Sequence, residues 1–161
     1  MRHRDAGTPR EDAITERIIG SAIEVHRILG PGLLESAYQE CLCDELSEAG
    51  LRFNRQVPLP VAYKGIQLAC RYRMDLVVED LIIVEIKTVE TILRVHSTQL
   101  LSYLRISGKG VGLLINFNAP TLTAGLRRIV NKFPEFSASR RLGVEPDALP
   151  TEEEVDATAL S

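Results

Sequence analysis

The sequence has no long uninterrupted run of apolar residues. A membrane-spanning helix needs roughly 18 of them in succession, and no stretch of the 161 residues approaches that length. The opening residues Met1 to Asp5 also lead into no apolar segment of the kind found in a secretory signal. We therefore expect no association with a membrane and predict a cytoplasmic location.

Cysteine is scarce, with only Cys41, Cys43 and Cys70 in the chain. Three cysteines cannot all pair in disulfides within one chain, and no histidine stands at a spacing that would complete a zinc site. Cys41 and Cys43 lie in a stretch with helical periodicity, where residues two apart point to different faces. We interpret all three as reduced packing residues.

The chain has the length of a single domain. With 161 residues and 45% hydrophobic content it can bury one core, and no internal repeat is visible. Residues 1–11 lack apolar periodicity, and we expect a flexible segment there. Residues 12–136 are the predicted domain, and residues 137–161 form an acidic tail that we expect to be disordered.

The net charge of −3 hides an uneven distribution. Residues 11–51 carry two arginines against nine acidic residues, a net of −7, whereas residues 52–132 carry twelve lysines and arginines against five acids, a net of +7. Residues 138–161 contribute two arginines against six acids, or −4. A basic face therefore remains available to phosphates, although separate solvated charges explain the same pattern.

Two helices are predicted at the start of the domain. From Ile14 to Leu29, apolar residues recur at steps of three and four, the period of an amphipathic helix, until Gly30-Pro31-Gly32 ends the pattern. A second helix is predicted over residues 33–49, and Gly50 closes it.

The sequence after Gly50 predicts a mixed sheet with a further helix. Pro58 and Pro60 suit an edge strand or a bulge. The largely apolar run 81–87 is typical of a strand buried on both faces, so we place it at the centre of the sheet. The expected elements are strands over 51–63 and 66–78 joined by a Lys64-Gly65 turn, the central strand 81–87, a helix over 95–106, a strand over 111–117, and a last segment, 121–131, that fits a helix or a strand and is assigned to a strand.

The charged end of the central strand is a candidate metal site. Side chains alternate across a strand, so Glu85 and Lys87 share one face and the Ile86 carbonyl lies between them. A hard cation such as Mg²⁺ needs oxygen ligands, and Asp75 on the preceding strand is the second candidate carboxylate. A three-residue loop over 79–81 pairs Asp75 with Glu85, whereas a two-residue loop pairs Asp75 with Val84, and the sequence suits either register.

This pattern has a plain alternative. On charge alone, an exposed salt bridge between Glu85 and Lys87 is the simpler explanation. A carboxylate-held metal together with a lysine would, however, meet the needs of phosphodiester hydrolysis, which are an activated water and relief of negative charge.

Three further segments match a known pattern: Gly32-Leu33-Leu34-Glu35-Ser36-Ala37-Tyr38, Arg73-Met74-Asp75 and Gln99-Leu100-Leu101-Ser102-Tyr103. The first resembles the signature of the GxxExxY protein family, and the likeness extends from about Ile14 to Asn131. That family is placed in the PD-(D/E)XK nuclease superfamily. The resemblance implies an α/β, restriction-endonuclease-like fold, which is a mixed β-sheet flanked by helices with an αβββαβ core, here with an extra N-terminal helix.

The resemblance also implies roles for single residues. Glu35 is like the helical acid that completes the metal site, Asp75 like the aspartate of the PD motif, and Glu85 and Lys87 like the ExK pair. Met74 stands where the superfamily name has proline, but the metal does not touch that side chain.

Two groups of residues are expected around this site. Gln99 and Tyr103 resemble the QxxxY motif of RecB-type nucleases, and at positions i and i+4 they share one helix face. Arg71 and Arg73 alternate onto the same strand face as Asp75, where they can hold a phosphate or balance the carboxylates.

Together these features predict a phosphodiesterase that depends on Mg²⁺ or Mn²⁺ and acts on DNA. Asp75, Glu85 and the Ile86 carbonyl are the predicted ligands, Glu35 a third or water-mediated one, and Lys87 the group that stabilises charge. The alternatives are a non-catalytic module that binds nucleic acid or protein, and a homodimer or subunit of a larger assembly, because a short chain offers little surface to grip a duplex.

Overall fold

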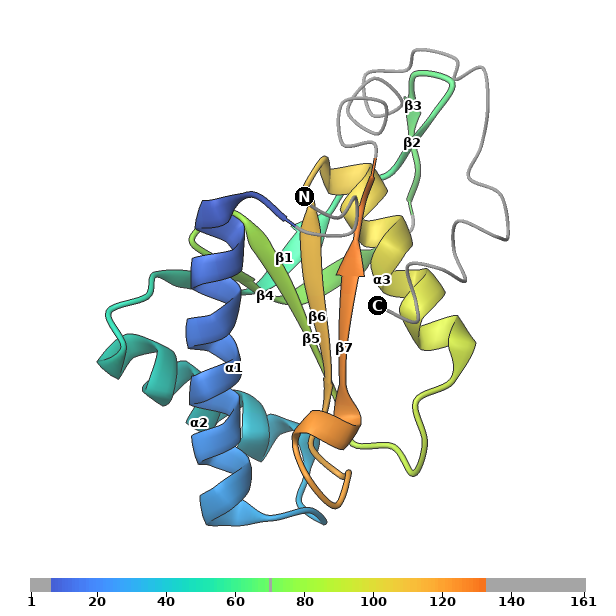
Figure 1. The fold of residues 1–161 in the computed structure, drawn as a ribbon. Helices are drawn as coiled ribbons and strands as arrows, with labels where there is room; N and C mark the ends of the chain where they lie inside the picture. Colours follow the sequence, from blue (N-terminus) through green and yellow to red (C-terminus); the bar gives the residue numbers. More distant parts are fainter. Residues whose placement is uncertain (1–6, 70, 133–161) are drawn as a thin grey trace.

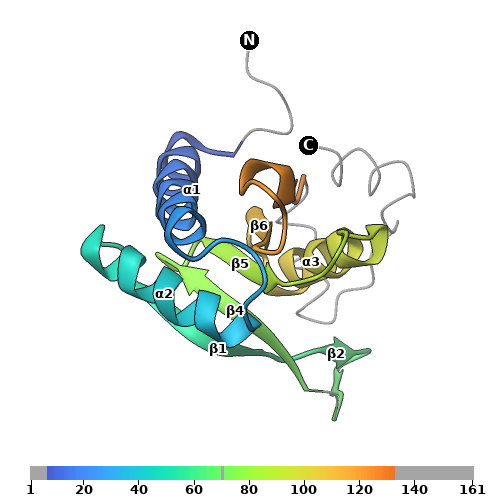
Figure 2. The same cartoon turned by 90° about the horizontal axis from the view of Figure 1, so that it is seen from below.

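The computed structural model describes residues 7–69 and 71–132. Within them, a five-stranded sheet has the order β1-β4-β5-β6-β7, and helices cover both of its faces (Figure 1). Figure 2 shows α1 and α2 together on one side of the sheet and α3 on the other. Cys70, residues 133–136 of the predicted domain and the predicted tail 137–161 lie outside the described residues.

The elements follow one another in the expected order. Their bounds are α1 Pro9–Leu29, α2 Glu35–Glu48, β1 Phe53–Leu59, β2 Ala62–Tyr63, β3 Ile66–Gln67, β4 Tyr72–Val78, β5 Ile82–Lys87, α3 Arg94–Ser107, β6 Val111–Asn116, the short 3-10 helix η1 Thr123–Gly125, and β7 Leu126–Val130. The series α2-β1-β4-β5-α3-β6 is the αβββαβ core, and α1 is the additional N-terminal helix. The expected α/β class with a mixed sheet flanked by helices is confirmed.

The first helix begins earlier than predicted. Residues 9–11 belong to α1, not to the flexible segment 1–11 that the absence of apolar periodicity suggested. The cause is a capping box, in which the Glu11 N–H donates to the Thr8 hydroxyl at 3.2 Å and the Thr8 N–H donates to the Glu11 carboxylate at 2.7 Å. Pro9, whose missing N–H is no loss at this position, is the first residue of the helix.

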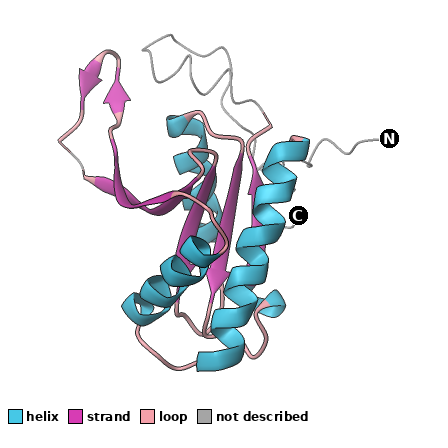
Figure 3. Cartoon of the chain, turned by 90° about the vertical axis from the view of Figure 1, so that its left-hand side faces the viewer, coloured by secondary structure: helices cyan, strands magenta, loops and turns pink. Residues whose placement is uncertain are grey.

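The two strands expected over 51–63 and 66–78 are each divided, the first into β1 and β2 and the second into β3 and β4. The prolines and the apolar run nevertheless mark the edge and the centre of the sheet. Within residues 7–69 and 71–132, β1 pairs with β4 alone and is an edge strand, while β5 is the middle strand of the sheet. The Lys64-Gly65 turn joins β2 to β3, a separate two-stranded hairpin that projects away from the main sheet (Figure 3). The segment 121–131, which fitted either a helix or a strand, contains both. The short helix η1 comes first and strand β7 follows, so only the second half is a strand.

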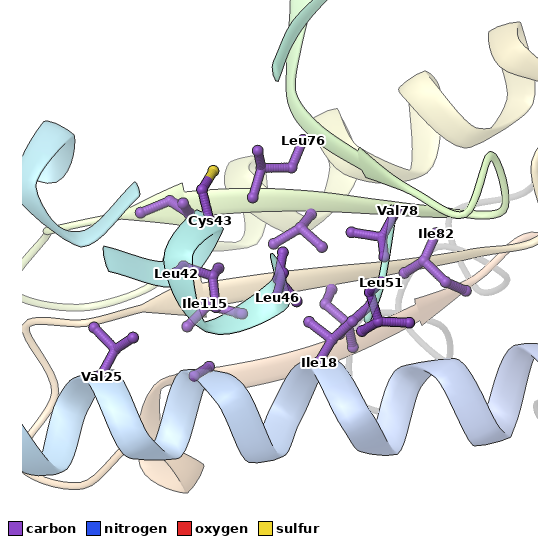
Figure 4. Packing of buried hydrophobic residues seen from close by; sticks show 14 of the residues in the cluster. Ile18, Val25, Leu42, Cys43, Leu46, Leu51, Leu76, Val78, Ile82 and Ile115 are labelled. Atoms are coloured by element: carbon purple, nitrogen blue, oxygen red, sulfur yellow. The ribbon is translucent and has the colours of Figure 1, made fainter. Parts of the chain in front are cut away.

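The sheet has a separate hydrophobic core on each face. The larger core packs α1 and α2 against even-numbered residues of β5, and Figure 4 shows Ile18, Leu46 and Ile82 among its side chains. The smaller core packs Leu100 and Leu104 of α3 against the opposite face. Each core removes apolar surface from water on its own side, which holds β5 between two helical layers. Over the described residues, no helix is long and apolar enough to cross a membrane.

Candidate active site

The site lies where strands β4 and β5 separate. The two strands pair antiparallel from Val78↔Ile82 to Leu76↔Val84, so three residues, 79–81, form the loop. This is the register that places Asp75 opposite Glu85. At that position the side chains bridge the strands: the Asp75 N–H donates to Glu85 Oε2 at 2.7 Å, and the Ile86 N–H donates to Asp75 Oδ2 at 2.8 Å.

The loop holds this register through an unusual backbone. Glu79 and Asp80 both have positive φ, at 53° and 55°, a conformation that side chains other than glycine seldom adopt. Glu79 is held there from both sides, because its N–H donates to the Arg52 carbonyl at 2.8 Å and its carboxylate accepts the Arg52 N–H at 2.6 Å. The three-residue loop is thus anchored to the chain that precedes β1.

The facing of β4 changes at Asp75. Leu76 packs in the core beneath α1 and α2, whereas Met74, two residues away, packs in the core beneath α3. Regular alternation would put both on one face. Gln56 of β1, which lies between the paired positions Arg55↔Leu76 and Val57↔Met74, has φ of 49°, so both strands are distorted at this level. The charge of Asp75 reaches side chains of both helical layers, because it raises the pKa of Glu35 on α2 and of Tyr103 on α3.

The Ile86 carbonyl faces the same opening. Along a strand, the N–H and C=O of one residue point to the same neighbouring strand, and successive residues alternate between neighbours. The Lys87 carbonyl accepts the Phe117 N–H at 3.0 Å and so points toward β6. The Ile86 N–H points the other way, to Asp75. The Ile86 carbonyl is therefore directed toward β4, beside the two carboxylates.

Burial makes both carboxylates hard to ionise. Glu85 is only 5% exposed, and burial, followed by the charge of Asp75, raises its pKa to about 8. Burial also raises the pKa of Asp75, although the hydrogen bond from the Ile86 N–H and the charge of Lys87 oppose the shift. Two buried acids, one of which is held neutral partly by the charge of the other, form a place where a cation would be stabilised.

Lys87 interacts electrostatically with these acids but, among the described residues, forms no salt bridge with any of them. It is half-buried, and its charge lowers the pKa of Asp75, Glu85 and Glu35. Over the ranges 7–69 and 71–132, no salt bridge links Lys87 to a carboxylate. Glu85 is buried and not at an exposed rim, so the simpler explanation of an exposed Glu85–Lys87 salt bridge is wrong.

Glu35 approaches from the helical layer of α2, where it is the first residue of the helix. The residue as a whole is exposed, but partial burial of its carboxyl and then the charge of Asp75 raise its pKa. Tyr38, one turn further on, fixes the loop before the helix, because its hydroxyl donates to the Gly30 carbonyl at 2.6 Å and accepts the Leu33 N–H at 3.1 Å. The Tyr38 ring stacks on Phe117 at 4.7 Å. Sequence reasoning missed this structural role of Tyr38.

The α3 layer brings Tyr103 to the site and leaves Gln99 at its margin. Tyr103 is buried, and burial together with the charges of Glu85 and Asp75 raises the pKa of its phenol. Gln99, one turn earlier on the same helix face, is exposed. His96 lies near Lys87, and burial followed by that charge lowers the pKa of its imidazole. Its Nδ1 accepts the Leu93 N–H at 2.9 Å, which leaves a proton on Nε2 when the ring is neutral.

A second residue that sequence reasoning missed is Asn116. Its side chain accepts the Val89 N–H at 3.0 Å and donates to the Val89 carbonyl at 2.8 Å, closing a two-bond clamp. Asn116 pairs with Lys87 across the parallel strands. The clamp therefore fixes the chain that leaves β5 directly after Lys87. The signal in the sequence was an amide at the end of a wholly buried strand.

Arg71 and Arg73 are exposed at the far end of β4. Arg71 immediately precedes the strand and Arg73 is its second residue. They lie on the side of Asp75 away from the β4–β5 loop, where β4 has no paired partner in β5. Because the facing of β4 changes at Asp75, strand alternation does not establish that either arginine shares its face. Their role in holding a phosphate therefore stays a prediction.

The donors present fit a hard divalent cation. One oxygen of each carboxylate accepts a backbone N–H, and the Gln56 side chain also hydrogen-bonds to the Asp75 carboxyl. The candidate ligands are the second oxygen of each carboxylate and the Ile86 carbonyl. Mg²⁺ retains several waters and is often held by one or two carboxylates, so this set suffices. No group of three His, Cys, Asp or Glu side chains within the described ranges is arranged to hold a metal ion. Direct coordination by Glu35 therefore stays a prediction.

Comparisons with known proteins agree with this geometry. Residues 12–129 match the family model described as the PD-(D/E)XK nuclease superfamily. No curated protein and no solved structure matched the chain. Proteins of this superfamily generally use divalent metals and act on nucleic acid. The match spans nearly the whole described fold, and we conclude that the chain belongs to the PD-(D/E)XK nuclease superfamily.

Proposed function

We propose that this protein is a divalent-metal-dependent phosphodiesterase that cleaves DNA. The observation that supports the proposal most is the exchange of carboxylate–amide hydrogen bonds between Asp75 and the Glu85-Ile86 pair at the point where the strands separate. It brings two acids with raised pKa values and one strand carbonyl to a single opening, with Lys87 next along β5.

Each residue of the site has a separate proposed role in cleavage. Asp75, Glu85 and the Ile86 carbonyl would hold Mg²⁺ or Mn²⁺, which when bound polarises the phosphodiester and activates a water molecule. Lys87 stabilises the negative charge that develops on the phosphate oxygens. Glu35, from the α2 side, accepts a hydrogen bond from the water that attacks.

Outer residues would hold the DNA. Arg71 and Arg73 pair with backbone phosphates beyond the opening. Tyr103 borders the two carboxylates, and Gln99 offers an exposed amide one helical turn away. Specific protein–DNA interfaces bury on the order of 1,000 Å² of protein surface or more, and a chain of this size offers little surface to a duplex. A second copy of the chain or a partner protein would supply the rest of the contact surface.

Cleavage by matched variants tests the proposal. Wild-type protein, Asp75→Asn and Lys87→Met are incubated with plasmid and with single-stranded DNA in Mg²⁺, Mn²⁺ or EDTA. We expect cleavage only with metal, and a loss of roughly 10²-fold or more in each variant, the usual scale for removing a group that stabilises transition-state charge. Lys87→Met keeps the aliphatic stem, so packing is preserved. Asp44→Asn, an exposed acid on α2, is the control and should match wild type.

Calorimetric titration of metal into DNA-free protein separates the alternatives. Binding by wild type that Asp75→Asn abolishes supports the proposed site. Absence of binding near neutral pH, together with DNA binding but no cleavage, would instead establish a non-catalytic module. Cleavage that survives both Asp75→Asn and Lys87→Met would remove the proposed mechanism altogether.

A further inference from the structure

Tyr72 is an exposed aromatic residue that the proposed cleavage does not use. It is 42% exposed at the start of β4. Its ring meets the ring of Tyr103 edge to face, with centroids 6.2 Å apart and an interplanar angle of 63°. Tyr103 in turn lies close enough to Glu85 and Asp75 for their charges to raise its pKa. An exposed aromatic ring is thus one side chain away from the carboxylates.

The strand around Tyr72 is open on one side. β4 pairs with β1 through Leu59↔Tyr72, but its pairing with β5 ends at Leu76↔Val84. Among the described residues, 72–74 therefore have a neighbouring strand on the β1 side and none on the side of β5. A polymer that reaches the site along this edge passes the Tyr72 ring first.

Cations flank the ring directly. Arg71 and Arg73 are its sequence neighbours and are exposed, and no salt bridge of either is found in the described part of the chain. Arg71, Tyr72 and Arg73 all line one surface hollow. A chain of phosphates lying over the open edge can reach them while a base turns inward to the ring.

Space for a base is present beside the ring. A surface hollow of about 380 Å³ is lined by this segment and by the chain that follows β1, including Pro58, Pro60 and Leu68. Its walls are mostly apolar, and Arg71 and Arg73 are among the residues that line it. An aromatic or apolar wall next to arginines is the arrangement that proteins use to stack unpaired bases and track a single-stranded backbone. A duplex keeps its bases stacked on one another and offers no free face to the ring.

From these contacts we propose that Tyr72 stacks an unpaired base of the DNA and that Arg71 and Arg73 hold its backbone, so that the substrate is single-stranded DNA or an unpaired end. This inference rests on the proposed function for the identity of the polymer. It adds the substrate class and a base-binding residue that the cleavage chemistry does not require.

A tryptophan reporter tests the stacking. The chain has no tryptophan, so Tyr72→Trp introduces a single fluorophore at the proposed position. In EDTA, where cleavage is not expected, oligo(dT) should quench its emission, and a duplex of equal length should need at least roughly tenfold more DNA. Tyr63→Trp, on the separate β2–β3 hairpin and 59% exposed, is the matched control and should respond weakly to both. If the emission of Tyr72→Trp responded equally to single strand and duplex, or to neither, the proposal would be overturned.

Affinity measurements keep the test independent of how the tryptophan packs. By anisotropy of a labelled single strand, Tyr72→Ala should bind roughly 5- to 100-fold more weakly, the range for one stacked base, while Tyr72→Phe should bind nearly as well as wild type. Each of Arg71→Gln and Arg73→Gln should reduce the slope of log affinity against log salt by roughly 0.7. Unchanged affinity in Tyr72→Ala would refute the stacking role.

The two proposals fail separately. Cleavage that depends on Asp75 and Lys87 but shows no effect of Tyr72 on single-strand affinity would leave the nuclease proposal standing and remove this one. Quenching of the Tyr72→Trp emission by single-stranded DNA, without any cleavage, would leave this inference standing and remove the nuclease proposal. Emission of Tyr72→Trp that changes with protein concentration and not with DNA would assign the ring to contact between copies of the chain, against the inference.

Discussion

In the metal-free protein, ionisation of Glu85 should destabilise the fold, so its stability should fall as the pH rises. Glu85→Gln should remove this dependence of stability on pH. The pKa of this acid rises from 4.5 to about 8 on folding. The folded protein therefore binds more protons than the unfolded chain between these values, and its stability falls as the pH rises through that window. The usual acid with a lowered pKa behaves in the opposite way.

The size of the effect follows from the shift. One pKa unit corresponds to about 1.4 kcal/mol, so the full loss well above pH 8 is on the order of 5 kcal/mol. For a domain of this size that corresponds to a fall in Tm of roughly 10 °C or more between about pH 5 and pH 9. Glutamine retains an oxygen that can accept the Asp75 N–H, so Glu85→Gln keeps the hydrogen bond and removes the charge.

Thermal unfolding followed by circular dichroism in EDTA measures this directly. Wild type should lose stability with rising pH much more steeply than Glu85→Gln, and the two curves should converge at low pH. Glu16→Gln, an exposed acid on α1, should follow wild type. Parallel curves for wild type and Glu85→Gln would refute the account of Glu85 as a buried, reluctantly ionised acid.

Adding metal to the same unfolding experiment gives an independent test of the role of Glu85. A ligand that binds only the folded state stabilises it by mass action. Excess Mg²⁺ should therefore raise the Tm of wild type, more at pH 8 than at pH 6, because the ligand must be ionised. The same addition should have little effect on Glu85→Gln, and an equal rise in both proteins would place the bound metal elsewhere.

Three substitutions test the framework of the site. Tyr38→Phe removes both hydrogen bonds of a fully buried residue's hydroxyl and should reduce the free energy of unfolding in urea by about 1–3 kcal/mol. Asn116→Ala leaves the N–H and C=O of Val89 without their clamp, and hydrogen exchange at Val89 should accelerate while exchange in α1 stays unchanged. Gly125→Ala drives its new methyl group into the Asn116 backbone carbonyl, whereas Gly112→Ala meets only a movable leucine side chain at 2.9 Å. Gly125→Ala should therefore lower the Tm more than Gly112→Ala.

Local patterns in the sequence determined most of the elements. The period of apolar residues predicts α1, α2 and α3 because burying one stripe of a helix dictates that spacing. The apolar run 81–87 predicts the central strand for a similar reason, since both of its faces are covered. The helix start at Pro9 was also encoded locally, in Thr8 and Glu11, but the apolar period does not report it.

Only the tertiary structure decided how the site is assembled. The apolar run 81–84 suits two registers, and the contact between Glu79 and Arg52, 27 residues away in the chain, accompanies the one that is adopted. The change of facing at Asp75 likewise depends on the distorted backbone of Gln56 in the neighbouring strand. Periodicity describes which side chains leave water, and it carries no information on which backbone groups meet across a sheet. The pairing of Asp75 with Glu85 is a contact of that second kind, so it became visible only in three dimensions.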